Sequence, residues 1–222
     1  IAADGAEPKP LTFSQVGASY GNATIFLFMG GFFIALAMQR WNLHRRIALG
    51  VLRIMPNSPG AMVAGFMIAT AFLSMWVSNT ATAVMMLPIG MSVLTLVNEA
   101  TGKSSTTSVA DVVQSKFGTA LMLGIAYAAS LGSLGTLIGT PPNTFLAGYM
   151  AETQGVSISF VGWMVVGVPI AAVFLVITWF LLVKVLFKPE ISEIPGGNEL
   201  IRKELDRLGP ISSGELRVLG VF

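Results

Sequence analysis

Long apolar runs, broken at two places by short polar clusters, dominate the pattern of this sequence. The first interruption is Ser-Asn-Thr at 78–80, which lies between the apolar stretches 61–77 and 81–97. The second, at 132–143, is rich in glycine and threonine and ends in two prolines, which cannot continue a helix. Irregular polar backbone is tolerated at membrane depth only where it is buried in protein or lines a wet cavity. We therefore expect both interruptions to form parts of a binding site.

The same pattern predicts helices of two kinds. Apolar runs of about 20 residues are long enough to cross a bilayer, whereas segments that mix arginines with regularly spaced apolar residues are typical of helices lying in the interface. The predicted segments are an external segment (1–21), a transmembrane helix (22–38), a cytoplasmic interfacial helix (39–56), a re-entrant hairpin (61–97) with its tip at 78–80, a cytoplasmic connection (98–116), a broken transmembrane helix (117–151) with its gap at 132–143, a transmembrane helix (160–187), a cytoplasmic linker with a second interfacial helix (189–213), and the start of a further span (214–222).

Basic residues on both sides of 61–97 favour the re-entrant hairpin. Arginines precede this segment at 40–53, and Lys103 and Lys116 follow it, so the positive-inside rule places both flanks in the cytoplasm. The segment must then cross an even number of times, but it is too short for two full spans and a turn. A hairpin that enters and leaves on the cytoplasmic side satisfies both conditions.

The same rule sets the direction of the later segments. No lysine or arginine lies between 117 and 183, so the turn at 152–159 is expected outside. The two halves of the broken helix are expected to span the bilayer only together. Positions 57 and 104 are therefore predicted to be cytoplasmic and position 155 external.

Composition supports a multi-pass membrane protein. The chain has 222 residues, of which 54% are hydrophobic and 11% charged, and its mean hydropathy is +0.75. Without cysteine and with one histidine, it offers no disulfide and no thiolate or imidazole metal site. The net charge of +2 is small, and the basic residues are clustered as membrane anchors are, which gives no indication of nucleic-acid binding. His44 has no partner pattern around it and is interpreted as an interfacial anchor.

The two interruptions also predict ion binding. A helix that ends at Ser78 directs unpaired carbonyls and its negative dipole end at the tip, and a helix that starts near Thr80 directs free N–H groups to the same place. The gap adds carbonyls at 130–133 and a second set of N–H groups near Asn143. Secondary transporters build midplane sites for a cation and an anionic substrate from such broken helices. Hydroxyl, amide and backbone oxygens without carboxylates favour an alkali cation over calcium or magnesium.

Serine, threonine and glycine also occur in membrane helices simply to pack them together. This interpretation is favoured for Ser74 taken alone, whereas the grouping of polar residues at 78–80 and 132–143 favours function. An intramembrane enzyme is disfavoured, because neither 61–97 nor 117–151 contains a charged residue or histidine.

Two motifs resemble a known family. Ser-Asn-Thr-Ala-Thr-Ala-Val-Met-Met-Leu-Pro at 78–88 and Gly-Thr-Leu-Ile-Gly-Thr-Pro-Pro-Asn at 135–143 are similar to the divalent anion/sodium symporters, the INDY-type carriers of di- and tricarboxylates. The resemblance covers about residues 20–190. It implies an all-α membrane protein in which this chain is the first of two inverted repeats, working as a homodimer by an elevator motion in a bacterial plasma membrane. Ile1 in place of methionine and the apolar turn at 216–222 fit a fragment of a longer chain.

The resemblance also assigns roles to single residues. It implies a sodium ion as the coupling ion, no other cofactor, and a di- or tricarboxylate as substrate. The sodium-binding residues would be Ser74, Ser78, Asn79, Gly132, Gly135 and Thr136. The substrate-binding residues would be Asn79, Thr80, Thr140 and Pro141.

The leading hypothesis is therefore a sodium-coupled symporter of dicarboxylates such as succinate. A sodium/sulfate symporter and a sodium-independent dicarboxylate exchanger are alternatives within the same class of carrier. A channel or an accessory membrane subunit is the alternative from a different class.

Overall fold

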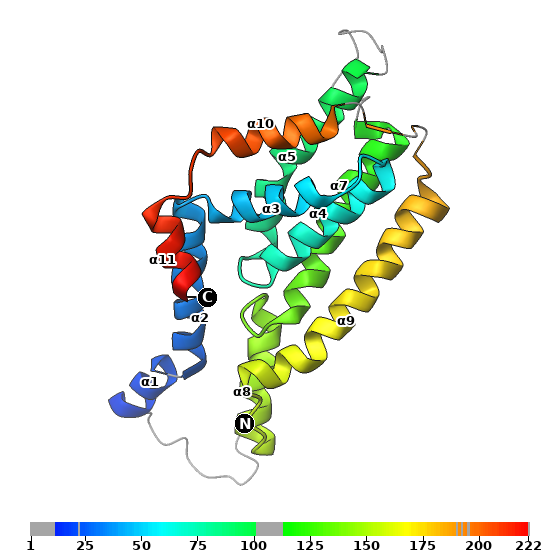
Figure 1. The fold of residues 1–222 in the computed structure, drawn as a ribbon. Coiled ribbons are helices and arrows are strands. Elements are labelled where there is room, and N and C mark those ends of the chain that lie inside the picture. Colours follow the sequence, from blue (N-terminus) through cyan, green and yellow to red (C-terminus); the bar gives the residue numbers. More distant parts are fainter. Residues whose placement is uncertain are drawn as a thin grey trace.

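The computed structural model describes residues 12–21, 23–100, 113–189, 191, 193–194 and 196–221. Within these ranges every regular element is a helix, which confirms the all-α prediction for the described part of the chain. Parts of the predicted external segment (1–11) and cytoplasmic connection (101–112) lie outside the described residues. The elements in Figure 1 are α1 (Phe13–Tyr20), α2 (Ala23–Arg40), α3 (Leu43–Ile54), α4 (Pro59–Ser74), α5 (Asn79–Ala100), α7 (Lys116–Gly132), the 3₁₀ turn η1 (Ser133–Gly135), α8 (Pro141–Gln154), α9 (Phe160–Phe180), the π-helix η2 (Leu181–Leu186), α10 (Gly197–Arg207) and α11 (Ser213–Val221).

Five of the described helices begin with the same local signal. Ser58, Ser115 and Ser159 precede α4, α7 and α9, and their side chains accept a hydrogen bond from the backbone N–H three positions further on, at 3.4, 3.0 and 3.0 Å. Ser78 and Ser212 precede α5 and α11 and accept from the backbone N–H at the same spacing, at 3.4 and 3.2 Å. Each serine caps its helix by satisfying one of the N–H groups that a helix leaves unpaired at its start. Their positions explain where the long apolar runs become helical.

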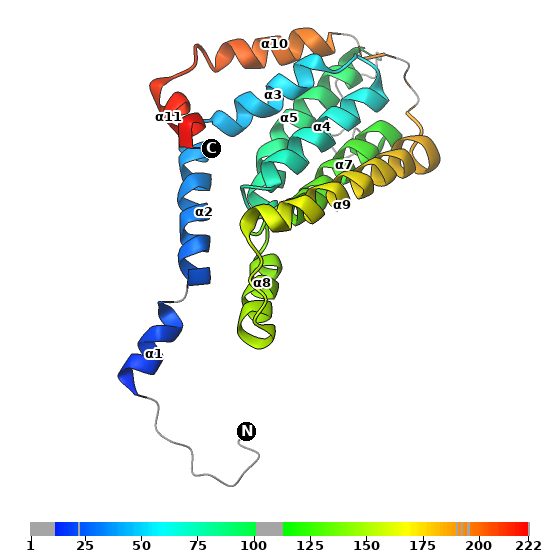
Figure 2. The same ribbon diagram turned by 60° about the horizontal axis from the view of Figure 1, so that its bottom comes forward.

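Helix α7 lies at the centre of the bundle and packs against α4, α5 and α9 (Figures 1 and 2). Phe66 and Met67 of α4 and Leu121 of α7 are almost completely buried. Near the end of α7, a Cβ atom on Gly132 would lie 2.2 Å from the carbonyl oxygen of Ala71. Glycine at this position therefore allows the backbones of α4 and α7 to touch.

Two amphipathic helices, α3 and α10, run side by side across one end of the bundle (Figure 1). The chain bends by 70° between α2 and α3, and Asn42 at the bend has a left-handed backbone with φ of 56°. Leu49 and Leu52 of α3 and Ile201 of α10 are buried against the bundle, while Arg53 is exposed. This arrangement suits the interfacial role expected for both segments.

Among the described residues, three helical stretches are long and apolar enough to cross a membrane, 79–99, 116–135 and 160–186, and α2 and α3 pass the same test together as a bent pair. Helix α4 is shorter, with 16 residues, or about 24 Å at 1.5 Å per residue. The predicted hairpin thus has one arm that is long enough to cross a membrane and one that is too short. The two halves of the broken helix (117–151) were expected to span the bilayer only together. The stretch 116–135 is long enough to cross by itself, so this expectation no longer follows from helix length.

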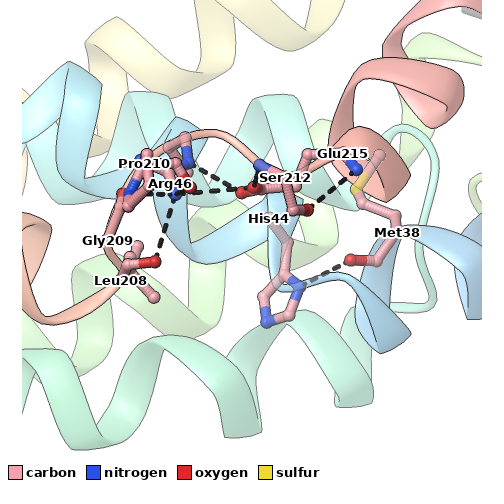
Figure 3. A network of polar contacts seen from close by, with 8 residues as sticks. All are labelled: Met38, His44, Arg46, Leu208, Gly209, Pro210, Ser212 and Glu215. Carbon is pink, nitrogen blue, oxygen red and sulfur yellow. Dashed lines mark hydrogen bonds and ion pairs between the residues drawn. The ribbon is translucent and has the colours of Figure 1, made fainter.

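A polar clasp joins α3 to the end of α10 and the start of α11 (Figure 3). The Arg46 guanidinium donates to Glu215 at 2.7 Å and to the Gly209 carbonyl at 3.0 Å. Ser212 and Glu215 cap each other, each accepting with its side chain from the backbone N–H of the other. The hydrogen bond from Arg46 holds the pKa of the Glu215 carboxyl below its usual range. The clasp therefore contains a carboxylate at neutral pH.

His44 is buried at the corner between α2 and α3 (Figure 3). Its Nδ1 donates to the carbonyl oxygen of Met38 at 3.2 Å. Burial lowers the pKa of the imidazole, so the ring is neutral at neutral pH. His44 thus stabilises the bend between α2 and α3 as a buried residue. This role was not part of the expectation that His44 is an interfacial anchor.

Candidate functional site

The two interruptions predicted from the sequence lie against each other. Helix α4 ends at Ser74 and α5 begins at Asn79, while α7 ends at Gly132 and α8 begins at Pro141. In Figure 1 the turn between α4 and α5 lies beside the loop between α7 and α8, about halfway along the bundle. Two segments that are far apart in the sequence thus form one region of non-helical backbone.

Side-chain hydroxyls hold the two interruptions together. Ser74 Oγ donates to the carbonyl oxygen of Ala129 at 2.6 Å, and Thr136 Oγ1 donates to the carbonyl oxygen of Met75. Ser74 and Thr136 are completely buried. The first bond connects the end of α4 to the last turn of α7, and the second connects the two interruptions directly, so their relative position is fixed at two points.

Two acceptor oxygen atoms lie beside the hydroxyl of Ser74. Its Oγ lies 3.0 Å from Asn79 Oδ1 and 2.6 Å from the Ala129 carbonyl oxygen. A serine hydroxyl carries one hydrogen, so it cannot fully satisfy two acceptors. The group offers hydroxyl, amide and carbonyl oxygens, the ligand types that hard cations prefer. No charged side chain occurs between 61 and 97 or between 117 and 151.

Asn143 closes the loop between α7 and α8. Its buried side-chain amide donates to the carbonyl oxygens of Ser133 and Thr136 at 2.9 and 2.8 Å. Thr144 donates to the Leu137 carbonyl, and the backbone N–H of Gly139 donates to Thr136 Oγ1 at 3.1 Å. The gap is therefore a braced loop with a defined shape. The roles of the Asn143 and Thr144 side chains were not predicted from the sequence, although polar residues that follow Pro-Pro in an apolar context indicate such a brace.

The start of α8 offers fewer N–H donors than expected. Pro141 and Pro142 have no N–H group, and the N–H of Asn143 donates to the Thr140 carbonyl at 3.1 Å. We expected free backbone N–H groups near Asn143 that could bind an anion. This expectation is wrong for positions 141–143, the first three residues of α8. The positive dipole end of α8 and the Thr140 hydroxyl remain as features that favour an anion.

The predicted site residues fall into three groups. Ser74, Asn79 and Thr136 belong to the joined interruptions, together with the buried glycines at 132 and 135. Ser78 and Pro141 line a cavity of about 80 Å³, which also includes Trp76 and Gly139 and is closed by Gly31 and Phe32 of α2. Thr80 is exposed and Thr140 half-buried, and their side chains take part in none of these contacts.

Comparison with known proteins places the chain in a family. A family model described as the sodium:sulfate symporter transmembrane region matches residues 7–222. A sodium-dependent dicarboxylate transporter, SdcS, of Staphylococcus saprophyticus is 47% identical over 208 residues, covering 94% of this chain and 39% of the relative. SdcS of Staphylococcus aureus strain USA300 is 45% identical over 212 residues, covering 96% of this chain and 40% of the relative.

The chain thus spans about two fifths of the length of the curated relatives it matches. Their names describe transport and not an enzymatic reaction, in agreement with the prediction from the uncharged spans. The family match covers nearly the whole chain and includes both motifs that carried the resemblance. The chain therefore belongs to the sodium:sulfate symporter family, the divalent anion/sodium symporters.

Proposed function

We propose that this chain forms one of two inverted repeats of a sodium-coupled carrier of dicarboxylates such as succinate. The observation that carries the proposal is the contact between the two helix interruptions, with Ser74 Oγ placed between Asn79 Oδ1 and the Ala129 carbonyl oxygen. The relatives are named as sodium-dependent dicarboxylate transporters, which supports both the ion and the substrate class.

The proposed sodium site is centred on Ser74. The oxygens of Ser74, Ser78 and Asn79 and the backbone of 132–136, including Gly132, Gly135 and Thr136, supply its ligands. A sodium ion would satisfy the oxygen acceptors that the single Ser74 hydrogen cannot serve. The site is uncharged, which suits a cation that must bind and leave in every cycle.

The proposed substrate site adjoins it at the start of α5. The Asn79 amide and the Thr80 hydroxyl are the donors to one carboxylate, and the helix dipole favours its negative charge there. Thr140 and Pro141 form the opposite side, next to the small cavity that Ser78 and Pro141 line. A dicarboxylate has a second charged end, and the additional length of the relatives leaves room for a second repeat with its own tip.

The remaining parts of the proposal concern the whole carrier. We assign α4 and α5 to a re-entrant hairpin that moves with α7, α8 and α9 as an elevator in a homodimer. The organisms of the relatives support a bacterial plasma membrane. Sodium-driven sulfate transport is the second candidate function, since the family description names sulfate. Exchange without sodium, a channel and an accessory subunit have no observation in their favour.

The test is transport by the natural protein that carries this sequence, purified and reconstituted in liposomes. An inward sodium gradient should drive saturable uptake of labelled succinate. Replacing sodium by choline should abolish uptake, and a proton gradient should not restore it, because the site contains no titratable group. Undiminished uptake in choline would refute sodium coupling, and sulfate that is taken up in preference to succinate would favour the second candidate.

A matched pair of variants connects this activity to the site. Asn79→Ala removes both an acceptor for the cation and a donor to the carboxylate, so sodium and succinate should each bind about tenfold more weakly or worse. Thr95→Ala is the control, because it removes a hydroxyl on the same helix that donates only to the Met91 carbonyl. If Asn79→Ala binds sodium and succinate as tightly as the parent does, the tip at 78–80 is not part of the binding site.

A further inference from the structure

Helix α4 begins beside the end of α9, at the same end of the bundle as α3 and α10 (Figures 1 and 2). The indole N–H of Trp179 donates to the Gly60 carbonyl at 2.9 Å and joins the two helices there. A cavity of about 480 Å³ opens beside this contact. It is lined by Ser58, Pro59, Gly60, Ala61, Trp179, Val183, Lys184, Lys188, Pro189 and Ile191.

The cavity carries two positive charges. Lys184 and Lys188 both line it, and no acidic residue is among the described residues that line it. Within the described residues, neither lysine forms an ion pair. Both side chains are exposed. Two ammonium groups beside one cavity favour an anionic ligand, and the three N–H donors of each suit phosphate oxygens.

An apolar groove continues from this cavity along the same two helices. It has a volume of about 210 Å³ and is lined by Ala64, Met67, Ile68, Leu175, Val176 and Trp179. Trp179 is shared between cavity and groove, and the other lining residues lie about one or two turns further along α4 and α9. The cations thus stand at the end of an apolar stretch of 27 residues, where lysine and tryptophan commonly mark the membrane surface.

We propose that this cavity and groove bind one anionic phospholipid, with its phosphate between Lys184 and Lys188 and one acyl chain along α4 and α9. Charge complementarity selects an anionic headgroup, and the apolar continuation selects a ligand with a hydrocarbon tail. Free phosphate would satisfy the lysines but not the groove. The lipid would hold the start of the hairpin against the end of α9, and the proposal does not depend on which substrate is carried.

The test measures lipid-dependent stability of the detergent-purified natural protein. Phosphatidylglycerol should raise its unfolding temperature in a saturable way, whereas phosphatidylcholine and inorganic phosphate should not. Lys184→Ala combined with Lys188→Ala should weaken the apparent affinity for phosphatidylglycerol roughly thirtyfold, since each basic residue near an anionic surface contributes about fivefold. Arg202→Ala with Lys203→Ala neutralises two exposed charges on α10 and is the matched control, which should bind as the parent does.

A second variant tests the groove separately from the charge. Ile68→Trp fills the groove from a position that is 45% exposed, so it should weaken phosphatidylglycerol binding without changing either lysine. Unchanged phosphatidylglycerol affinity in the double lysine variant or in Ile68→Trp would overturn the proposal. Equal stabilisation by inorganic phosphate or by phosphatidylcholine would also overturn it, in favour of a simple anion site or of general lipid contact.

Discussion

Asn143 determines the shape of the loop between α7 and α8. Its amide nitrogen donates to two carbonyls, those of Ser133 and Thr136, and its side chain is 5% exposed. Thr136 in turn donates to Met75 in the other interruption. One amide group therefore positions the backbone that carries the proposed sodium ligands, although the amide itself is not among them.

Asn143→Asp should separate this bracing role from side-chain size. Aspartate has nearly the same shape but no donor, so two carbonyl oxygens would face a carboxylate. Loss of hydrogen bonds to buried acceptors costs about 1–3 kcal/mol each, and we expect a lower unfolding temperature together with weaker sodium binding. Asn42→Asp is the control, because Asn42 is exposed and aspartate also tolerates its left-handed backbone. An unfolding temperature for Asn143→Asp that matches this control would contradict the bracing role.

At the scale of single residues, the sequence predicted the polar side chains of the candidate site but not the backbone groups that they contact. The polar residues of the two motifs could be selected because they stand out in apolar runs. The backbone carbonyls of Ala129 and Met75, which accept from Ser74 and Thr136, could not be selected, because every residue has such a group and only the packing of α4 on α7 decides which ones meet. A functional role for Ser74 is therefore indicated only by its hydrogen bond to the Ala129 carbonyl in the structure.

At the scale of helices, local signals predicted the boundaries better than the contacts. The amphipathic pattern at 39–56 corresponds to α3 at Leu43–Ile54, and the prolines at 141 and 142 correspond to the start of α8. The clasp between Arg46 and Glu215 was not predicted, because the two residues are 169 positions apart in the sequence. Pairing of charges over such a distance has no periodic pattern that would reveal it.

Glu215→Gln should loosen α11 and the end of α10 from α3. The Arg46 and Glu215 side chains are 17% and 4% exposed, so the variant leaves a mostly buried guanidinium without its carboxylate. Hydrogen bonds to charged groups contribute about 1.5–3 kcal/mol, and the free energy of unfolding should fall by this order. Glu199→Gln is the control, because its ion pair with Lys203 is exposed at the surface.

The difference in the free energy of unfolding between the parent and Glu215→Gln should depend on pH in a definite direction. The pKa of the Glu215 carboxyl is lowered in the folded protein by the hydrogen bond from Arg46. A group of this kind contributes stability above its unfolded pKa, about 4.3 for glutamate, and loses it as the pH falls through the folded value. Chemical unfolding at neutral pH should therefore show the full difference between parent and Glu215→Gln, and unfolding at strongly acidic pH a smaller one. A difference that grows on acidification would mean that the clasp is not an ion pair.

At the scale of the whole molecule, composition and apolar run lengths predicted an all-helical membrane protein. The expectation that both interruptions contribute to a binding site came instead from the two polar motifs and the family resemblance, and the contact between the interruptions in the structure depends on the packing of α7 against α4, α5 and α9. Composition and run lengths also did not show whether segment 61–97 crosses the membrane, and this was predicted from the basic residues on both sides of it. Helix α4 is too short to cross, whereas 79–99 is long enough, so helix length alone does not distinguish a re-entrant hairpin from a crossing.

Labelling of single cysteines decides between these two paths. Residues 1–222 contain no cysteine, and any cysteine elsewhere in the natural protein is first replaced by serine, so that each label is specific. Ser58→Cys, Ser104→Cys and Ser157→Cys introduce similarly small side chains before the hairpin, after it and in the turn following α8. If α4 and α5 form a re-entrant hairpin, a membrane-impermeant maleimide added to intact cells should label position 157 only. Positions 58 and 104 should react after the membrane is permeabilised, because basic residues flank both sides of the hairpin. Labelling of position 104 from outside would mean that α5 crosses completely, and the Ser-Asn-Thr tip would then be the turn between a short inserted helix and a full span.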